Sequence, residues 1–255
     1  MKYLIGDIGN TSTKICLLNQ KFKIIKHFEI DTKKNIKKNF LKRILSRYKT
    51  KSLNPNFLFS SVVPLAFKEM KKRFKYTKYK IYEVKDFDLK KIIKLNVKNT
   101  KQLGSDRIAN AIGVQKFNNC LVVDFGTATT FDVIKNNIYE GGVIAPGVRL
   151  SIANLYNSTA LLPLIKLKNI KKSYGKNTKD ALNAGFMWGY EGLINNIINK
   201  IVKTNKTNFK IILTGGYANF FKNSIKKKVL IDQNITIKGI AKIYKKFLWV
   251  KKNYF

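Results

Sequence analysis

The chain has 255 residues and a formal net charge of +37, because 51 lysine and arginine residues stand against 14 aspartate and glutamate residues. This length allows a sizeable core in one large domain or in two of ordinary size, and the lack of an apolar run of about 18 residues predicts no membrane-spanning helix. The two cysteines are too few for a disulfide framework or a structural zinc site, so a reduced cytoplasm is expected.

The positive charge is carried mainly by lysine, since only five of the 51 basic residues are arginine. The lysines are scattered among many Asn and Ile residues, which is the pattern that an AT-rich coding bias produces. Proteins that read bases favour arginine forks and aromatic platforms, and neither is concentrated here. We therefore expect no specific nucleic-acid partner and no membrane partner, with non-specific adhesion to nucleic acid only at low salt.

Residues 1 to about 31 predict three strands, and the first two flank a glycine turn rich in hydroxyl groups. The turn reads Asp7-Ile8-Gly9-Asn10-Thr11-Ser12-Thr13. It places a carboxylate at a strand end beside a glycine that lets a ligand approach the backbone, and its hydroxyl and N–H groups can hold phosphate oxygens. Because the chain enters this strand directly, we expect no cleaved signal peptide.

The segment after this turn predicts an α/β half-domain in which helices and strands alternate. Helices are expected over residues 33–49 and 65–74, and strands over residues 57–63 and 81–84.

The motif Gly104-Ser105-Asp106-Arg107 opens the next predicted helix. A helix N-terminus offers unpaired N–H groups and the positive end of a dipole. Serine and aspartate are also ordinary helix caps, but Arg107 is not needed for a cap and is mildly disfavoured by the dipole. The motif therefore favours a ligand site over capping alone.

The first turn pattern returns 117 residues later as Asp124-Phe125-Gly126-Thr127-Ala128-Thr129-Thr130, again between two apolar runs. An ordinary tight turn would account for either copy alone. Two matched copies indicate duplicated half-domains that face one nucleotide.

Five further features follow the second turn. They are a glycine-rich stretch (141–147), a helix (148–156), a long helix (177–202), a strand (210–214) and a lysine-rich helix after residue 240. Gly185 and Gly189 in the long helix permit close packing of another helix or chain. Gly215 and Gly216 follow the strand, where an adenine or ribose can lie against the backbone.

Two common nucleotide-binding motifs are absent from the sequence. Neither a GxxxxGK[ST] loop nor a strand–GxGxxG–helix fingerprint occurs, so a P-loop kinase and a Rossmann dehydrogenase are not supported. Phosphoryl transfer needs positioning and charge neutralisation more than covalent chemistry, and two aspartate turns can supply both through carboxylates that arrange cations.

The paired aspartate turns resemble the phosphate-binding signature of the superfamily of sugar kinases, actin and chaperone ATPases. Together with Gly104–Arg107 and the stretch 141–147, the chain resembles the type III pantothenate kinases from Asp7 to about Gly216. The resemblance implies an α/β fold of two duplicated actin-like (ribonuclease H-like) half-domains, residues 1–117 and 118–255. Each would be a mixed sheet flanked by helices, with the nucleotide between them.

The resemblance also implies an activity, which is ATP-dependent phosphorylation of pantothenate at the start of coenzyme A synthesis. Asp106 would be the proton acceptor that activates the primary hydroxyl. Pantothenate would contact Gly104, Ser105, Asp106, Arg107 and Thr178. ATP would contact Asp7, Ile8, Gly9, Asn10, Thr11, Ser12, Thr13, Lys14, Thr127, Gly215 and Gly216.

The cofactors and partners implied by the resemblance are two cations and a second copy of the chain. Asp124 would hold a monovalent cation, K⁺ or NH₄⁺, and Asp7 would help to position Mg²⁺. The chain would form a homodimer.

The chain departs from the family pattern at one place. Val97 stands where the family usually has a tyrosine, and Asn99-Thr100 replaces Asn-Pro, which implies a repacked pantothenate pocket. Two alternatives stay open: a kinase of this fold with another small hydroxylated substrate, and a non-catalytic regulatory or nucleic-acid-binding relative. Retention of Asp7, Asp106 and Asp124 argues against the second, since binding alone does not need three such carboxylates.

Overall fold

A computed structural model of the chain describes residues 1–33, 40–47, 52–169 and 174–249. It contains two compact units, which are described separately below. The first unit comprises residues 1–116, residues 137–139 and the segment from Asn234 onward; the second comprises residues 117–136 and 140–233. The second half-domain was predicted over residues 118–255, whereas the segment that begins at Asn234 belongs to the first unit.

The first unit is built on a five-stranded sheet in the order β3-β2-β1-β4-β5. Its strands are β1 (Lys2–Ile8), β2 (Ser12–Leu18), β3 (Ile24–Asp31), β4 (Leu53–Ser61) and β5 (Lys80–Glu83). β2 runs antiparallel to both β1 and β3, while β1, β4 and β5 run parallel to one another. The carboxyl ends of β1, β4 and β5 therefore meet at one edge of the sheet, where ligands bind in open α/β sheets.

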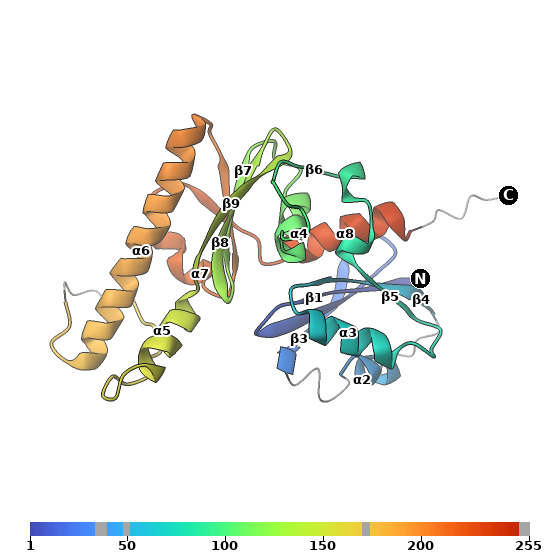
Figure 1. Cartoon of the computed structure of the whole chain (residues 1–255), viewed down its shortest axis with the longest axis horizontal. Helices are drawn as coiled ribbons and strands as arrows, with labels where there is room; N and C mark the ends of the chain where they lie inside the picture. Colours follow the sequence, from blue (N-terminus) through green and yellow to red (C-terminus); the bar gives the residue numbers. More distant parts are fainter. Residues whose placement is uncertain (34–39, 48–51, 170–173, 250–255) are drawn as a thin grey trace. The chain divides into compact units, whose positions relative to one another are not determined.

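Helices cover both faces of this sheet (Figure 1). α2 (Phe40–Arg47) and α3 (Pro64–Arg73) pack on one face, where Ile44 and Met70 join strand residues such as Phe57 in a buried cluster. α4 (Ser105–Gly113) and α8 (Ile235–Phe247) contact the other face through β4 and β1. Residues 34–39 and 48–49 of the helix predicted over 33–49 lie outside the described residues.

α4 and α8 pack against each other at two glycines. A Cβ atom on Gly239 of α8 would overlap the backbone carbonyl of Ala109 in α4. A Cβ atom on Gly113 would lie 2.5 Å from the carbonyl oxygen of Ile235. Because any larger residue would push the two helices apart, these glycines set how closely α8 holds α4.

The second unit repeats the strand order of the first. Its strands are β7 (Cys120–Phe125), β8 (Ala128–Lys135), β9 (Ile138–Pro146), β10 (Lys210–Gly215) and β11 (Val229–Ile231), in the order β11-β10-β7-β8-β9. β7 and β8 form an antiparallel hairpin, and β10 runs parallel to β7 and β11. Both sheets thus place a hairpin, a third strand beyond it and two parallel strands on the other side. This arrangement confirms the predicted α/β fold with two duplicated mixed sheets.

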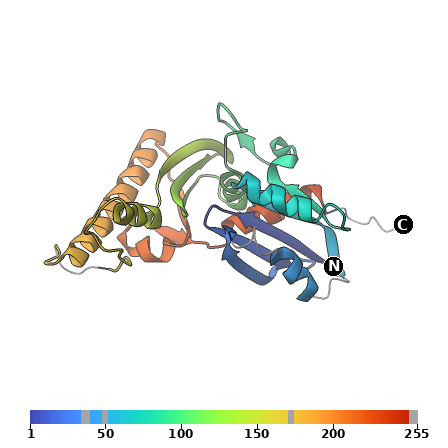
Figure 2. The same ribbon diagram turned by 60° about the horizontal axis from the view of Figure 1, so that its bottom comes forward.

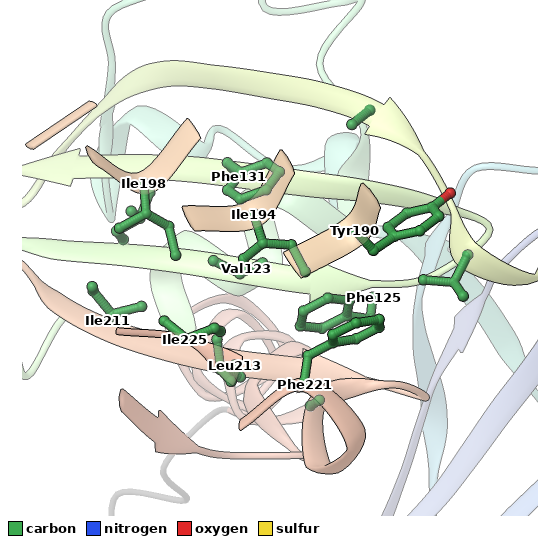
Figure 3. Packing of buried hydrophobic residues seen from close by; sticks show 14 of the residues in the cluster. Val123, Phe125, Phe131, Tyr190, Ile194, Ile198, Ile211, Leu213, Phe221 and Ile225 are labelled. Atoms are coloured by element: carbon green, nitrogen blue, oxygen red, sulfur yellow. The ribbon is translucent and has the colours of Figure 1, made fainter. Parts of the chain in front are cut away.

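The core of the second unit lies between its sheet and the long helix α6 (Thr178–Asn205). Figure 3 shows Tyr190, Ile194 and Ile198 of α6 above strand residues such as Val123 and Leu213. α5 (Val148–Asn157) lies beside α6 (Figures 1 and 2), and α7 (Ala218–Phe221) closes the core with Phe221. No helix among the described residues is long and apolar enough to cross a membrane.

Several elements were not expected from the sequence. The stretch 141–147 was expected as a glycine-rich motif, and most of it belongs to strand β9, in which Gly141 has φ +116°. Two glycines in succession hide the alternation that marks a strand. The short elements are β6 (Lys94–Leu95), which pairs with the start of β9, and the 3₁₀ turns η2 (Val84–Asp86), η3 (Leu89–Lys91) and η4 (Lys222–Ser224).

Candidate active site

The first aspartate turn joins β1 to β2 at the edge where the parallel strands end. Asp7 lies opposite Lys14 on β2 and Ser60 on β4, so the three side chains share one face of the sheet. Ser60 is fully buried, and its hydroxyl has no hydrogen-bond partner among the described residues. A carboxylate, an ammonium group and an available hydroxyl are therefore placed side by side.

The turn itself has a fixed base and an exposed tip. The N–H of Gly9 donates to the carbonyl of Ser12 (3.0 Å), and the hydroxyl of Thr32 donates to the carbonyl of Gly9 (2.7 Å). The hydroxyls of Thr13 and Thr32 lie 3.0 Å apart and both residues are buried. Asn10 and Thr11 at the tip are exposed. The tip can thus offer N–H and hydroxyl groups to phosphate oxygens without a change at the base.

Helix α4 begins at the same edge of the first sheet. The hydroxyl of Ser105 donates to the carbonyl of Ser61 at the end of β4 (3.2 Å), and the N–H of Val62 donates to the carbonyl of Ile8 (3.1 Å). The helix cap is Gly104, which makes no side-chain cap bond. Ser105 therefore does not serve as the cap that its residue type allows; it ties the helix to the strand. A Cβ on Gly104 would overlap Oδ1 of Asp106, so a larger residue there would displace that carboxylate from its present position.

Asp106 is a half-buried residue in the first turn of α4. Burial raises the pKa of its carboxyl group, and the N–H and guanidinium of Arg107 partly oppose this rise. The N–H of Arg107 donates to Asp106 Oδ1 (2.8 Å). A carboxylate with a raised pKa is better matched to proton transfer near neutral pH than an exposed one.

Arg107 is supported by an aromatic residue that no sequence motif identified. Its guanidinium carbon lies 5.9 Å from the centre of the Tyr139 ring, within the range of a cation–π contact. Tyr139 is fully buried, and its carbonyl accepts from the N–H of Asn96 (2.8 Å). Asn96 directly precedes Val97. The segment in which a valine stands at the position expected for a tyrosine is therefore hydrogen-bonded to Tyr139, the residue whose ring contacts Arg107.

The second aspartate turn occupies the equivalent place in the second sheet. Asp124 lies opposite Thr130 on β8 and Thr214 on β10. Asp7 pairs with Lys14, seven positions later, whereas Asp124 pairs with Thr130, six positions later, because the second turn is one residue shorter. The position of Lys14 in the first hairpin is therefore held by Thr130 in the second.

Two glycines shape the surroundings of the second turn. Gly215 has φ +83°, and a Cβ there would lie 2.6 Å from Oδ1 of Asp124. A Cβ on Gly147 would overlap the carbonyl of Thr127. Gly216 is less crowded. Its N–H donates to the carbonyl of Phe125 (3.0 Å), and a Cβ added to Gly216 would lie 4.0 Å from the same carbonyl oxygen. Gly215 thus makes room for the Asp124 carboxylate, and Gly216 leaves space beside the backbone.

The oxygens around Asp124 fit a hard cation. The Thr130 hydroxyl is buried and has no hydrogen-bond partner among the described residues. Carboxylate and hydroxyl oxygens are the ligands that K⁺ and Mg²⁺ take. Within the described part of the chain, no three His, Cys, Asp or Glu side chains gather to hold a metal ion by themselves, so remaining ligands would come from phosphate, backbone or water.

Thr178 is not brought to the second turn within the second unit. It is the first residue of α6, is exposed, and lines a mainly apolar pocket of about 380 Å³ with Leu155, Leu162 and Phe186. Leu155 lies near the end of α5, roughly two helical turns from Gly147 at its start. Thr178 therefore belongs to a separate surface made by α5 and α6.

Two hairpins with strand-end aspartates, at equivalent places on two duplicated mixed sheets, define a protein of the actin-like α/β fold class. The fold is that of the activator of 2-hydroxyisocaproyl-CoA dehydratase from Clostridium difficile with bound ADPNP, with a TM-score of 0.53, 12% identity and 100% of both chains covered.

The family itself follows from the sequence comparisons. The family model for type III pantothenate kinase matches residues 3–200. The type III pantothenate kinase of Pelagibacter ubique (strain HTCC1062) is 51% identical over 94% of this chain and 97% of that protein. That of Sulfurihydrogenibium sp. (strain YO3AOP1) is 36% identical over 93% and 97%. The chain belongs to the type III pantothenate kinase family and is an enzyme.

Proposed function

We propose that the chain transfers the γ-phosphoryl group of ATP to the primary hydroxyl of pantothenate, the first step towards coenzyme A, with Asp106 as the base. The observation that carries this assignment is the half-buried Asp106 carboxylate, held at the start of α4 with a pKa that burial raises, in a member of this family. Asp106 accepts the hydroxyl proton, the freed oxygen attacks the γ-phosphorus, and ADP leaves.

The remaining residues of the motif orient the substrate. Gly104 and Ser105 present backbone close to the base, and Arg107 offers a planar cation to the pantothenate carboxylate or its polar groups. The contact between Arg107 and Tyr139 fixes the plane of that cation. Thr178 and its pocket supply a further substrate contact from α6.

ATP contacts are assigned to both hairpins. The exposed tip Asn10–Thr11 and the Lys14 ammonium group hold phosphate oxygens in the first unit. Thr127 does so in the second, while Gly215 and Gly216 give access for the ribose or adenine. Asp124 with Thr130 would hold K⁺ or NH₄⁺, and Asp7 would position Mg²⁺. These cations neutralise charge that develops on the phosphates.

The active form is proposed to be a cytoplasmic homodimer. Among the described residues, nothing apart from the neighbouring backbone of α6 itself lies within 4 Å of a Cβ placed on Gly185 or Gly189. Trp188 on the same helix is 46% exposed, and Leu161, in the segment between α5 and α6, is 91% exposed. An apolar surface with small residues fits a second copy of the chain better than water.

A coupled assay for ADP release tests the substrate. Purified protein is supplied with ATP, MgCl₂, KCl and either pantothenate or one of a panel of small alcohols. Pantothenate is expected to give the highest kcat/KM. A higher kcat/KM for another hydroxylated compound would replace pantothenate as substrate and keep the kinase chemistry. Absence of ADP release with every acceptor would refute the proposed function.

A further inference from the structure

A second carboxylate lies at the edge where α4 begins, and no sequence motif contains it. Glu83 is the last residue of β5, and its two oxygens accept from different backbone groups. Oε1 accepts from the N–H of Ser61 (3.3 Å), and Oε2 accepts from the N–H of Lys85 (2.5 Å). Glu83 thus joins the ends of two neighbouring strands through its side chain.

The same carboxylate reaches the first turn of α4. The hydroxyl of Ser105 donates its single hydrogen to the carbonyl of Ser61, the residue whose N–H donates to Glu83. The nearby Ser105 hydroxyl also lowers the pKa of the Glu83 carboxyl group, against the larger rise that burial causes. Since Gly104 provides no side-chain cap, the bond from this hydroxyl to the carbonyl of Ser61 is a side-chain link between the helix start and the sheet. Ser105 directly precedes Asp106, so the link lies one residue from the proposed base.

The residues after Glu83 add a second connection to the motif. Asp86 accepts from the N–H of Glu83 (2.9 Å) and closes the η2 turn around it. The ammonium group of Lys85 donates to the carbonyl of Lys101, three residues before Gly104 (3.0 Å). The positive charge of Lys85 also acts on both Glu83 and Asp106. β5 and η2 therefore hold the segment before α4 and the first turn of α4.

We propose that Glu83 is a positioning residue that fixes the first turn of α4, and with it the Asp106 carboxylate, against the ends of β4 and β5. The inference rests on the proposed role of Asp106 as the base. Glu83 itself does not touch substrate in this proposal. It acts through Ser105 and through the backbone of β4.

The arrangement requires a carboxylate rather than an amide. Each oxygen of Glu83 faces one backbone N–H, and a glutamine has only one oxygen to accept with. In Glu83→Gln, one of the two N–H groups must face the amide NH₂ group. The side chain then turns or moves away, and Ser105 loses a fixed partner. Because buried N–H groups without partners are costly, the helix start shifts although the size of the side chain is unchanged.

The experiment compares Glu83→Gln with Glu69→Gln, a matched change on α3, which covers the opposite face of the same sheet. kcat, KM for pantothenate and KM for ATP are measured at 25 °C, where both variants are checked to be folded. We expect kcat of Glu83→Gln to fall about 10- to 100-fold, as for a base displaced by up to about 1 Å, with KM for ATP unchanged. Glu69→Gln should match the wild type.

A second variant and a second measurement keep the test decisive. Ser105→Ala removes the link while leaving the bonds of Glu83 to β4, and kcat should fall about threefold to tenfold, less than the effect of moving the base fully. If Glu83→Gln does not fold, Ser105→Ala decides alone. Wild-type kcat in folded Glu83→Gln or in Ser105→Ala would overturn the positioning role, even if the melting temperature falls.

Hydrogen exchange separates this proposal from the proposed function. Amides in the first turn of α4 should exchange faster in Glu83→Gln than in Glu69→Gln, whatever the substrate is. If the wild type does not phosphorylate pantothenate, the proposed function fails while this readout still decides the positioning role. Equal exchange in the two variants would refute the positioning role independently.

Discussion

Replacement of Gly239 by alanine should destabilise the protein through one backbone contact. The added Cβ would overlap the carbonyl of Ala109 in α4. The obstacle is backbone in a regular helix, so it cannot rotate away as a side chain would. α8 must therefore move outward from α4 and leave part of its buried face, including Ile240 and Ile243, less well packed.

The magnitude follows from two opposing contributions. Overpacking a filled core costs about 1–3 kcal/mol, and a backbone obstacle favours the upper end. Alanine in place of glycine inside a helix returns about 1 kcal/mol. The net loss is about 2 kcal/mol, which for a protein of this size lowers the melting temperature by about 4–8 °C.

The matched control is Gly192→Ala in α6, where, in the part of the chain that the structure describes, only neighbouring backbone of the same helix lies within 4 Å of the added Cβ. Within one copy of the chain only the helix propensity changes there, so a gain of about 1 kcal/mol and a rise of about 2–4 °C are expected for the monomer. Because Gly192 lies on the same face of α6 as Gly185 and Gly189, both variants are measured at a concentration where light scattering gives a monomer. Calorimetry on both variants measures the melting temperature, which should fall in Gly239→Ala and rise in Gly192→Ala. A Gly239→Ala protein that melts at or above the wild-type temperature would contradict the close α4–α8 packing on which the reasoning depends.

Four further predictions concern the site and its partners. Asp106→Asn should lower kcat about 10²–10⁴-fold with ATP affinity nearly unchanged, and wild-type turnover in this variant would exclude Asp106 as the base. In the wild type, kcat/KM should rise with pH through a pKa above the ordinary aspartate value, because burial raises the pKa of Asp106. Asp124→Ala should weaken ATP use and flatten a potassium titration, while an unchanged activation curve would move the cation site elsewhere. Light scattering should give a dimer, and a lone 29.4 kDa species would rule it out. Filter binding to several DNA and RNA sequences should weaken steeply and equally with salt, whereas sequence-selective binding at physiological salt would favour a regulatory role.

The sequence predicted the elements that its local patterns encode. The two hairpins, the helix after Gly104 and the long helix α6 all lie close to their expected places, since each combines a clear period with a glycine or a cap at its boundary. The duplication was predicted from the two matched turns, whereas the strand order was not predicted. Whether the assigned site residues act as proposed is for the experiments above.

The sequence could not reveal relations between distant residues. Nothing near Glu83 marks it, because its partners Ser61 and Ser105 come from β4 and α4 and meet it only in the folded sheet. Tyr139 reads as an ordinary buried strand residue until Arg107 is placed over it. The return of α8 to the first unit also leaves no local signal, since its apolar face would fit either sheet.

That return of α8 has a consequence for the order of synthesis. The buried strand residues Ile5, Cys16 and Leu58 are translated early. Helix α8, which belongs to the same unit, is translated only after residue 233. At about 5–20 residues per second, the intervening residues 117–233 take roughly 6–24 s to translate. During that interval the nascent N-terminal sheet lacks its last helix and exposes an apolar face to which chaperones can bind. The first unit is therefore completed only after the second unit has been made, and a fragment that ends at residue 117 would lack α8.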